Sequence, residues 1–274
     1  RDFCLSRGLG DVYKRQAYKH VPMMENNPGE SVRNNVEGTR IIADLAVKYR
    51  AKKFVMVSTD KAVNPTNVMG CSKRICEIYV QSLDKAEKDG KVEGVTQFVT
   101  TRFGNVLGSN GSVIPLFKEQ IKQGGPITVT HPDIIRFFML IPEACKLVLE
   151  AGTMGNGGEI FVFDMGKPVK IVDLARRMIQ LSGAKNVEIK FTGLRDGEKL
   201  YEEVLNEEET TKPTFHPKIK IAQVREYDYA DVCRQVDELV ASSVKEDDMG
   251  IVRRMKEMVP EFKSKHSVYE VLDK

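Results

Sequence analysis

A run of hydroxyl, acidic and basic side chains follows a short apolar segment, and its residue types could transfer protons. Ser58, Thr59, Asp60 and Lys61 come directly after residues 54–57, which read Phe-Val-Met-Val. Asp60 could act as an acid and Lys61 as a base, provided that burial or a nearby cation lowers the pKa of the lysine. Taken alone, Asp60 and Lys61 could equally be a solvated pair in a turn.

A second pair follows eight residues later. Met69 and Lys73 are four positions apart, so on a helix they share one face. A thioether can neither donate nor accept a catalytic proton, which excludes Met69 as a base. Without further context, Met69 is most simply a core residue.

The elements around these residues alternate between helix and strand. Apolar periodicity predicts helices over residues 30–49 and 71–83 and strands over 54–57 and 96–100. This alternation is typical of βαβ units in a parallel sheet, where ligands bind at the carboxyl ends of the strands. The second half is predicted to contain helices over 113–123, 142–151, 169–181, 229–242 and 251–258, and strands over 127–130, 159–163 and 187–191.

Composition removes several classes of function. Apolar residues make up 41% and charged residues 30% of the 274 residues, with a net charge of +3 and no basic block, so we expect no nucleic-acid partner. No apolar run reaches the ~18 residues of a membrane helix, so we expect no membrane segment in this chain. The five cysteines form no CxxC pair, and we expect neither a metal site nor a disulfide framework.

Residues 57–74, VSTDKAVNPTNVMGCSKR, resemble the active-site segment of nucleoside-diphosphate-sugar 4,6-dehydratases, which are extended short-chain dehydrogenases/reductases. Within that group the chain is most similar to the large, membrane-anchored UDP-N-acetylglucosamine 4,6-dehydratases of bacterial surface-polysaccharide and glycoprotein pathways. The resemblance runs from Ala17 to about Lys274. It implies an α/β fold with a Rossmann-like parallel sheet and a smaller C-terminal α/β subdomain that binds the substrate.

The resemblance also implies a reaction in three stages. NAD oxidises C4 of the hexose, water leaves across C5 and C6, and the hydride returns to C6. In this scheme Thr59 hydrogen-bonds the C4 oxygen, Asp60 protonates the departing C6 hydroxyl, and Lys61 takes the C5 proton. Met69 stands where most of the superfamily has tyrosine, and Lys73 holds the nicotinamide ribose.

Further segments extend the implied site. The residues expected to contact NAD are Lys19, Ser58 and Lys73. The residues expected to contact the UDP-sugar are Asn105, Ser112, Val113, Arg136, Arg195 and Glu198. Arginine suits a diphosphate better than lysine does, because its donors are bidentate. Arg136 and Arg195 could also form structural salt bridges.

The glycine-rich turn that holds the NAD pyrophosphate in this family has no counterpart here. No G-x-G-x-x-G follows a predicted strand. We expect the first βα units, roughly 60–90 residues at ~30 per unit, to be missing from a truncated reading frame. Residues 1–16 are predicted to be a non-native leader, 17–106 the C-terminal part of the NAD-binding domain with the catalytic loop, and 107–274 mainly the nucleotide-sugar-binding subdomain. We expect this chain to be inactive and to bind NAD poorly.

Two other functions remain open. A nucleotide-sugar epimerase of the same superfamily usually keeps the tyrosine that Met69 replaces. A non-catalytic nucleotide-sugar-binding module would need only the arginines. For the intact protein we expect a homo-oligomer in the cytoplasm, anchored at the cytoplasmic face of the bacterial inner membrane. The sequence leaves the exact sugar and the stereochemistry at C5 undetermined.

Overall fold

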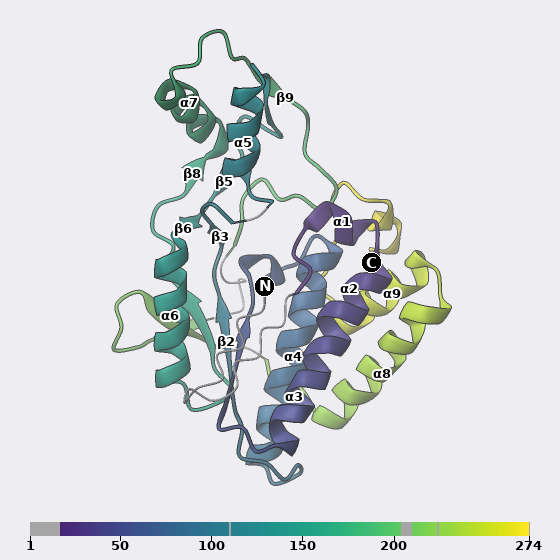
Figure 1. Cartoon of the computed structure of the whole chain (residues 1–274). Coiled ribbons are helices and arrows are strands. Elements are labelled where there is room, and N and C mark those ends of the chain that lie inside the picture. Colours follow the sequence, from purple (N-terminus) through teal and green to yellow (C-terminus); the bar gives the residue numbers. More distant parts are fainter. Residues whose placement is uncertain (1–16, 110, 204–209, 224, 274) are drawn as a thin grey trace.

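The computed structural model describes residues 17–109, 111–203, 210–223 and 225–273. The predicted leader, residues 1–16, lies outside the described residues. Two parts can be distinguished in Figure 1. The main body is built around a five-stranded sheet, and a small lobe stands above it.

The sheet of the main body is mixed. Strands β1, β2 and β7 run parallel, and β11 and β10 extend the sheet as an antiparallel hairpin. The α/β fold with a parallel sheet is therefore confirmed, whereas the hairpin was not predicted, because β10 is short and mostly exposed. In sheet order the strands are β1 (Lys53–Val57), β2 (Gln97–Arg102), β7 (Ile160–Phe163), β11 (Ile219–Gln223) and β10 (Thr210–Pro213).

Helices cover both faces of this sheet (Figure 1). Helix α6 (Ile141–Met154) lies on one face and α4 (Val68–Lys88) on the other. Beside α4 runs one long helix made of α2 (Pro28–Ser31), the π-helical η1 (Val32–Glu37) and α3 (Gly38–Lys48). The outer layer is α8 (Tyr229–Lys245) and α9 (Asp248–Met258).

The C-terminal helices share one apolar core with α4. Val236 and Met255 are buried in the same cluster as Ile75 and Tyr79. Residues 107–274 therefore contribute to both parts. Some of their elements form the small lobe, and the others belong to the main body, namely β7, β10, β11, α6, α8 and α9. A boundary at residue 106 does not separate the two parts, because long-range packing brings the chain back.

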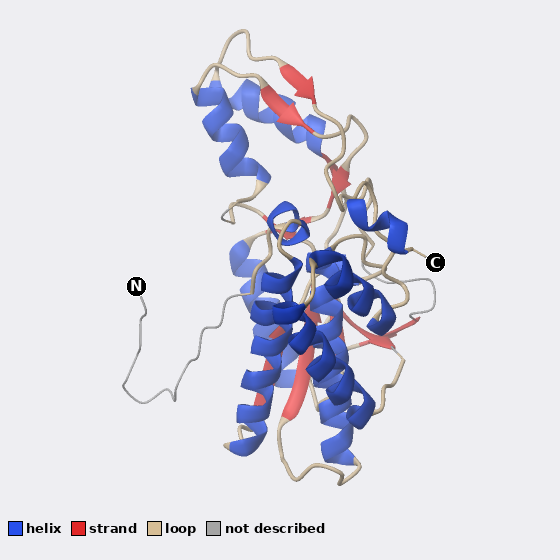
Figure 2. Ribbon diagram, turned by 90° about the vertical axis from the view of Figure 1, so that its right-hand side faces the viewer, coloured by secondary structure: helices blue, strands red, loops and turns tan. Residues whose placement is uncertain are grey.

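The small lobe has its own core. Helices α5 (Val113–Lys122) and α7 (Ile171–Ser182) pack on the parallel pair β4 (Ile127–Val129) and β9 (Ile189–Phe191), as Figure 2 shows at the top of the molecule. Two short strand pairs join it to the main body. They are β3 (Asn105–Val106) with β6 (Phe138–Met139) and β5 (Ile135–Arg136) with β8 (Val169–Lys170). The remaining elements are α1 (Val21–Glu25), η2 (Asp60–Ala62) and η3 (Val268–Leu272).

Strand β1 lies at the edge of the sheet. Within the described residues it pairs only with β2, and its backbone together with Leu45 and Tyr49 of the neighbouring helix lines an open hollow. Tyr49 is 73% exposed. Among the described residues no further strand pairs with this edge, which is unusual for a parallel strand beside apolar side chains.

Two features are not found among the described residues: a membrane-spanning helix and a metal site. Across the described ranges, the helices are too short or too polar to cross a bilayer. The same residues include no group of three or more His, Cys, Asp or Glu side chains arranged to hold a metal ion.

A buried ion pair joins α4 to the ends of β1 and β2. Arg102 donates from Nε to Glu77 Oε1 at 2.8 Å and from Nη2 to Oε2 at 2.6 Å, and both side chains are fully buried. Ser58 donates to the same carboxylate at 2.6 Å, and Arg74 does so at 3.1 Å. Burial opposes ionisation of Glu77, but Arg102, then Arg74 and Ser58, outweigh it and lower its pKa to about 2.

We predict that Glu77→Gln destabilises the protein by about 3–5 kcal/mol, because it leaves Arg102 buried without its counter-charge. Urea unfolding measures the change. Glu257→Gln on α9 is the control, since Glu257 is exposed and forms no ion pair with a described residue, and it should change stability little. A similar small effect of both variants would contradict the prediction. Because the pKa of Glu77 falls from 4.5 to about 2 on folding, its stabilising contribution is complete above pH 4.5 and is lost as pH falls toward 2.

Candidate active site

One large cavity of about 1410 Å³ runs along the open edge of β1 and continues between the main body and the small lobe. Every residue singled out from the sequence lines it except Asp60, whose carboxylate lies directly behind the lining. These side chains come from segments between residues 19 and 198, so the fold brings them together. The lining residues are Lys19, Ser58, Thr59, Lys61, Met69, Lys73, Asn105, Ser112, Val113, Arg136, Arg195 and Glu198.

The loop after β1 is held firmly at the carboxyl edge of the sheet. The Ser58 backbone N–H donates to the Thr101 carbonyl at 2.7 Å, and the Asp60 N–H donates to the Phe103 carbonyl at 3.2 Å. Thr59 begins the short helix η2, with its side chain accepting from the Lys61 N–H at 3.4 Å. Thr59, Asp60 and Lys61 therefore lie on a backbone segment that the neighbouring strand fixes.

Asp60 and Lys61 form a direct pair. Lys61 Nζ donates to Asp60 Oδ1 at 3.0 Å and to Asn105 Oδ1 at 3.1 Å, and lies 3.4 Å from Glu202 Oε1. The Thr59 hydroxyl donates to Asp60 Oδ1 at 2.8 Å. The other oxygen of Asp60, Oδ2, is buried and has no hydrogen-bond partner among the described residues.

The pKa of Lys61 is shifted in the direction opposite to the one expected. Burial lowers it, but the charges of Asp60 and Glu202 outweigh burial and raise it above its ordinary value. The geometry agrees, because the three neighbours of Nζ are all acceptors, which suits an ammonium with three donors. The predicted lowering is therefore wrong for this structure, in which Lys61 holds the proton.

Met69 and Lys73 share one face of α4, as their spacing predicts, and both line the cavity. Lys73 is 8% exposed, and its ammonium makes no hydrogen bond or ion pair with the residues that the structure describes. A nearly buried cation without a partner needs acceptors from a ligand. Such an ammonium fits the hydroxyl groups of a ribose, as expected for the nicotinamide end of NAD.

Lys19 approaches the same region from the segment before α1. Its Nζ donates to Ser109 Oγ at 3.3 Å. Burial, and then the positive charge of Lys61, lower its pKa. Four lysines thus line the cavity, namely Lys19, Lys53, Lys61 and Lys73, and among the described residues only Lys61 of these forms ion pairs with carboxylates.

The small lobe offers a site for an anion at the start of α5. Ser112 precedes this helix, and its hydroxyl is buried without a hydrogen-bond partner among the described residues. Backbone N–H groups in the first turn of a helix have no intrahelical acceptor and attract anions. Arg195 also lines the cavity, and its guanidinium forms no ion pair with a described residue. Together they could bind a diphosphate.

Arg136 is differently placed. Its guanidinium donates to the carbonyls of Ile135 at 2.7 Å, Lys199 at 2.8 Å and Leu200 at 3.3 Å, and to Glu198 Oε1 at 3.3 Å. Its donors are thus engaged by the protein, which is the structural role that the sequence left open. Glu198 is engaged too, because it also accepts from Thr130 at 3.2 Å and from the Arg195 N–H at 3.1 Å.

Two carboxylates of the site were missed from the sequence. Glu77 supports Ser58 from beneath, and Glu202 contacts both Lys61 and Arg136. Glu202 lies only four residues after Glu198, so an acidic residue so close to a predicted site residue was the available signal. Glu77 lies on the helix of Lys73, one turn further on, where an acidic residue in an apolar run was the available signal.

The sheet, the loop at its carboxyl edge and the cavity are similar to the Rossmann-like fold of short-chain dehydrogenases/reductases. The family model described as "Polysaccharide biosynthesis protein" matches residues 4–224, and the chain belongs to this family. It is 54% identical over 245 residues to the capsular polysaccharide biosynthesis protein CapD of Staphylococcus aureus, which covers 89% of this chain and 40% of CapD. The chain therefore spans about two fifths of the length of that relative.

Solved structures and a further relative agree on the fold. The X-ray structure of Pen from Bacillus thuringiensis superposes with a TM-score of 0.70 at 38% identity, covering 75% of this chain and 64% of Pen. DesIV of Streptomyces venezuelae, a dTDP-glucose 4,6-dehydratase, has a TM-score of 0.62 at 20% identity over 70% of this chain and 62% of DesIV, which shows the fold alone. A UDP-glucose 4-epimerase of Rickettsia rickettsii is 41% identical over 206 residues, covering 75% of this chain and 58% of the epimerase.

The position of Lys61 depends on a glycine in the first turn of α4. A Cβ added at Gly70 would lie 2.2 Å from the Lys61 carbonyl oxygen, so η2 packs directly on the helix backbone. We predict that Gly70→Ala costs about 1–3 kcal/mol, because the loop must move away. Gly152→Ala, inside α6, is the control and should change stability by less than about 1 kcal/mol. Equal urea midpoints for Gly70→Ala and the unchanged protein would show that the loop is not held in this way.

Proposed function

We propose that this chain carries the proton-transfer and substrate-binding part of an NAD-dependent nucleotide-sugar 4,6-dehydratase that acts on a UDP-N-acetylhexosamine, foremost UDP-N-acetylglucosamine. The observation that carries the proposal is the Asp60–Lys61 pair, fixed at the sheet edge and bonded at 3.0 Å. A simple redox reaction at one carbon needs no such pair. Removal of water from C5 and C6 needs one group that accepts a proton and one that gives it.

The protonation of the pair is consistent with a closed cycle. Lys61 begins as an ammonium and Asp60 as a carboxylate that accepts from it. Transfer of the proton across their hydrogen bond gives a neutral amine and a carboxylic acid. Asp60 then gives its proton to the departing C6 hydroxyl, and Lys61 takes the C5 proton. At this point the pair has its starting protonation, and one water molecule has left the sugar. Return of the hydride to C6 needs a proton at C5, which Lys61 gives. The pair then takes up one proton, equal to the one that the C4 hydroxyl released on oxidation, and the cycle closes.

The remaining site residues have roles in binding under this proposal. The diphosphate of the UDP-sugar lies at the start of α5, held by the first backbone N–H groups at Val113, by Ser112 and by Arg195. Thr59 and Asn105 contact the hexose. Arg136 and Glu198 hold the site together instead of binding the diphosphate, because the protein already engages them.

NAD, when bound, would accept the hydride from C4 and return it to C6. Ser58, Lys73 and Lys19 would hold its ribose and nicotinamide end, for which the unpartnered Lys73 ammonium is the structural support. We propose that a further parallel strand pairs with the open edge of β1 and brings the glycine-rich turn for the pyrophosphate. We also propose that the intact protein is a homo-oligomer in the cytoplasm at the inner membrane, in surface-polysaccharide synthesis.

A 4-epimerase is the second candidate. The likeness to the rickettsial UDP-glucose 4-epimerase favours it. An epimerase usually keeps a tyrosine where this chain has Met69, but both reactions begin with oxidation of the C4 hydroxyl, for which a thioether cannot be the base. What favours dehydration is the Asp60–Lys61 pair, because epimerisation removes no water. A binding module without turnover would use the Arg195 end alone and would leave the paired Asp60 and Lys61 without a purpose.

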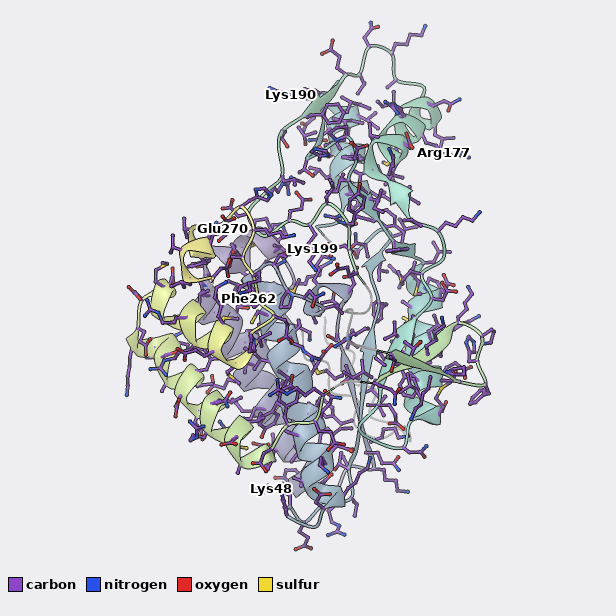
Figure 3. All side chains as sticks on the ribbon, turned by 180° about the vertical axis from the view of Figure 1, so that it is seen from behind. Lys48, Arg177, Lys190, Lys199, Phe262 and Glu270 are labelled. Carbon is purple, nitrogen blue, oxygen red and sulfur yellow. The ribbon has the colours of Figure 1, made fainter. Side chains whose placement is uncertain are left out.

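Lys61 is the residue whose loss separates these functions. We predict that a fusion of the N-terminal part of the staphylococcal relative to residues 17–274 converts UDP-N-acetylglucosamine to a 4-keto-6-deoxy sugar, detected by NMR. Lys61→Met in this fusion should lower turnover at least about 100-fold, because the acceptor of the C5 proton is gone. Lys190→Met, an exposed lysine of the small lobe, should leave turnover unchanged (Figure 3). Unchanged turnover in Lys61→Met would refute the role of Lys61.

Arg195 gives a test of binding that needs no turnover. We predict that Arg195→Gln weakens binding of UDP to this chain about tenfold or more in calorimetry, because a charge-assisted contact to phosphate is lost. Arg177→Gln, an exposed arginine of the same lobe shown in Figure 3, should bind UDP as the unchanged chain does. Equal affinities of the two variants would place the diphosphate elsewhere.

A further inference from the structure

Glu202 stands at the meeting point of the two parts of the molecule. Its side chain is 3% exposed, and one carboxylate oxygen, Oε1, lies 3.4 Å from Lys61 Nζ and 3.5 Å from Arg136 Nε. The other oxygen, Oε2, is buried without a hydrogen-bond partner among the described residues. Lys61 belongs to the loop after β1, whereas Arg136 belongs to β5. A single oxygen atom therefore connects the catalytic loop to the small lobe.

The segment that precedes Glu202 contacts both the small lobe and the main body. On one side, Arg136 donates to the carbonyls of Lys199 at 2.8 Å and Leu200 at 3.3 Å. From the same segment, Lys199 Nζ donates to the Val63 carbonyl at 3.0 Å, directly after η2. Figure 3 shows Lys199 at the junction of the small lobe and the main body. These contacts fix the backbone, so the carboxylate of Glu202 has a defined position.

We propose that Glu202 is a positioning residue for Lys61, which holds the lysine ammonium against Asp60 and couples it to Arg136 of the opposite part of the site. This inference rests on the proposed function in one respect, the role of Lys61 in proton transfer. The geometry of the Lys61–Glu202–Arg136 chain does not depend on which reaction follows. Glu202 is not assigned a contact with substrate.

The charges around Lys61 explain what Glu202 contributes. From its own loop Lys61 faces Asp60, and from the segment after the small lobe it faces Glu202. Arg136 on β5 and Lys19 before α1 bring positive charge from the other sides. Without Glu202 a single carboxylate would stand against two cations. The ammonium would then lose its proton more readily, and one of its three acceptors would be weakened.

An NMR titration of the chain tests this without any turnover. With lysines labelled by ¹³C at Cε and Lys61 assigned through Lys61→Arg, the Cε shift reports protonation between about pH 8 and 12, a window that extends above the ordinary lysine pKa of about 10.4. Glu202→Gln should displace the Lys61 curve toward lower pH by about 1 unit or more, because a carboxylate within ion-pair distance is neutralised. Glu203→Gln is the matched control. Glu203 is half exposed and pairs with Lys199 at 3.1 Å, so its variant should give the curve of the unchanged chain.

Superimposed Lys61 curves for Glu202→Gln and Glu203→Gln would overturn the proposal. If Glu202→Gln fails to fold, Glu202→Asp keeps the charge beside Arg136 and shortens the reach. Its Lys61 curve should move in the same direction by a smaller amount, and a curve identical to that of the unchanged chain would equally contradict the proposal. Since turnover is not measured, loss of this inference and loss of the proposed dehydration are separate results.

Discussion

The buried carboxylate of Glu77 is the interaction on which the site depends. It receives two hydrogen bonds from Arg102 at the end of β2 and one from Ser58 at the end of β1, and it is fixed on α4. The two elements that present Thr59, Asp60, Lys61 and Lys73, β1 with its following loop and α4, are thereby joined to each other and to β2. Burying these charges is costly unless each is paired, so the elements must keep this arrangement for the ion pair to be satisfied.

A second cluster of charged side chains surrounds Lys61. Lys61 lies between Asp60 and Glu202, and the two carboxylates keep it protonated although it is almost buried. A lysine that starts protonated and is bonded to its own proton acceptor can return to that state after it exchanges protons with a substrate. The two charge clusters have different roles. The Glu77 cluster fixes the backbone of the loop, and the Asp60–Lys61–Glu202 cluster sets the protonation of Lys61.

Local pattern predicted much of this architecture, and long-range packing accounts for the rest. The helix over 30–49 was found from its apolar period, although its π-helical turn over residues 32–37 was not. Helix α4 begins at Val68, three residues earlier than predicted, because Asn67 accepts from the Gly70 N–H at 2.8 Å and caps it. The hairpin β10–β11 joins the sheet by pairing with β7, as in Ile219 with Phe163, and α8 and α9 return to α4 across more than a hundred residues. No local period reveals either contact.

The site shows the same division. The resemblance of residues 57–74 to a known active site identified side chains that the fold gathers around one cavity. The pKa direction of Lys61 and the engagement of Arg136 by backbone carbonyls could not be read from the sequence, because both depend on Glu202 and Lys199 from another part of the chain.

The central claim is that Asp60 and Lys61 serve dehydration. The most direct test uses UDP-N-acetylglucosamine labelled with deuterium at C4. The fusion of residues 17–274 to the N-terminal part of CapD converts it, and NMR locates the deuterium in the product. Dehydration by the proposed route predicts a 4-keto-6-deoxy product with the deuterium at C6. A product that retains both the C6 hydroxyl and deuterium at C4 would show epimerisation and contradict the account.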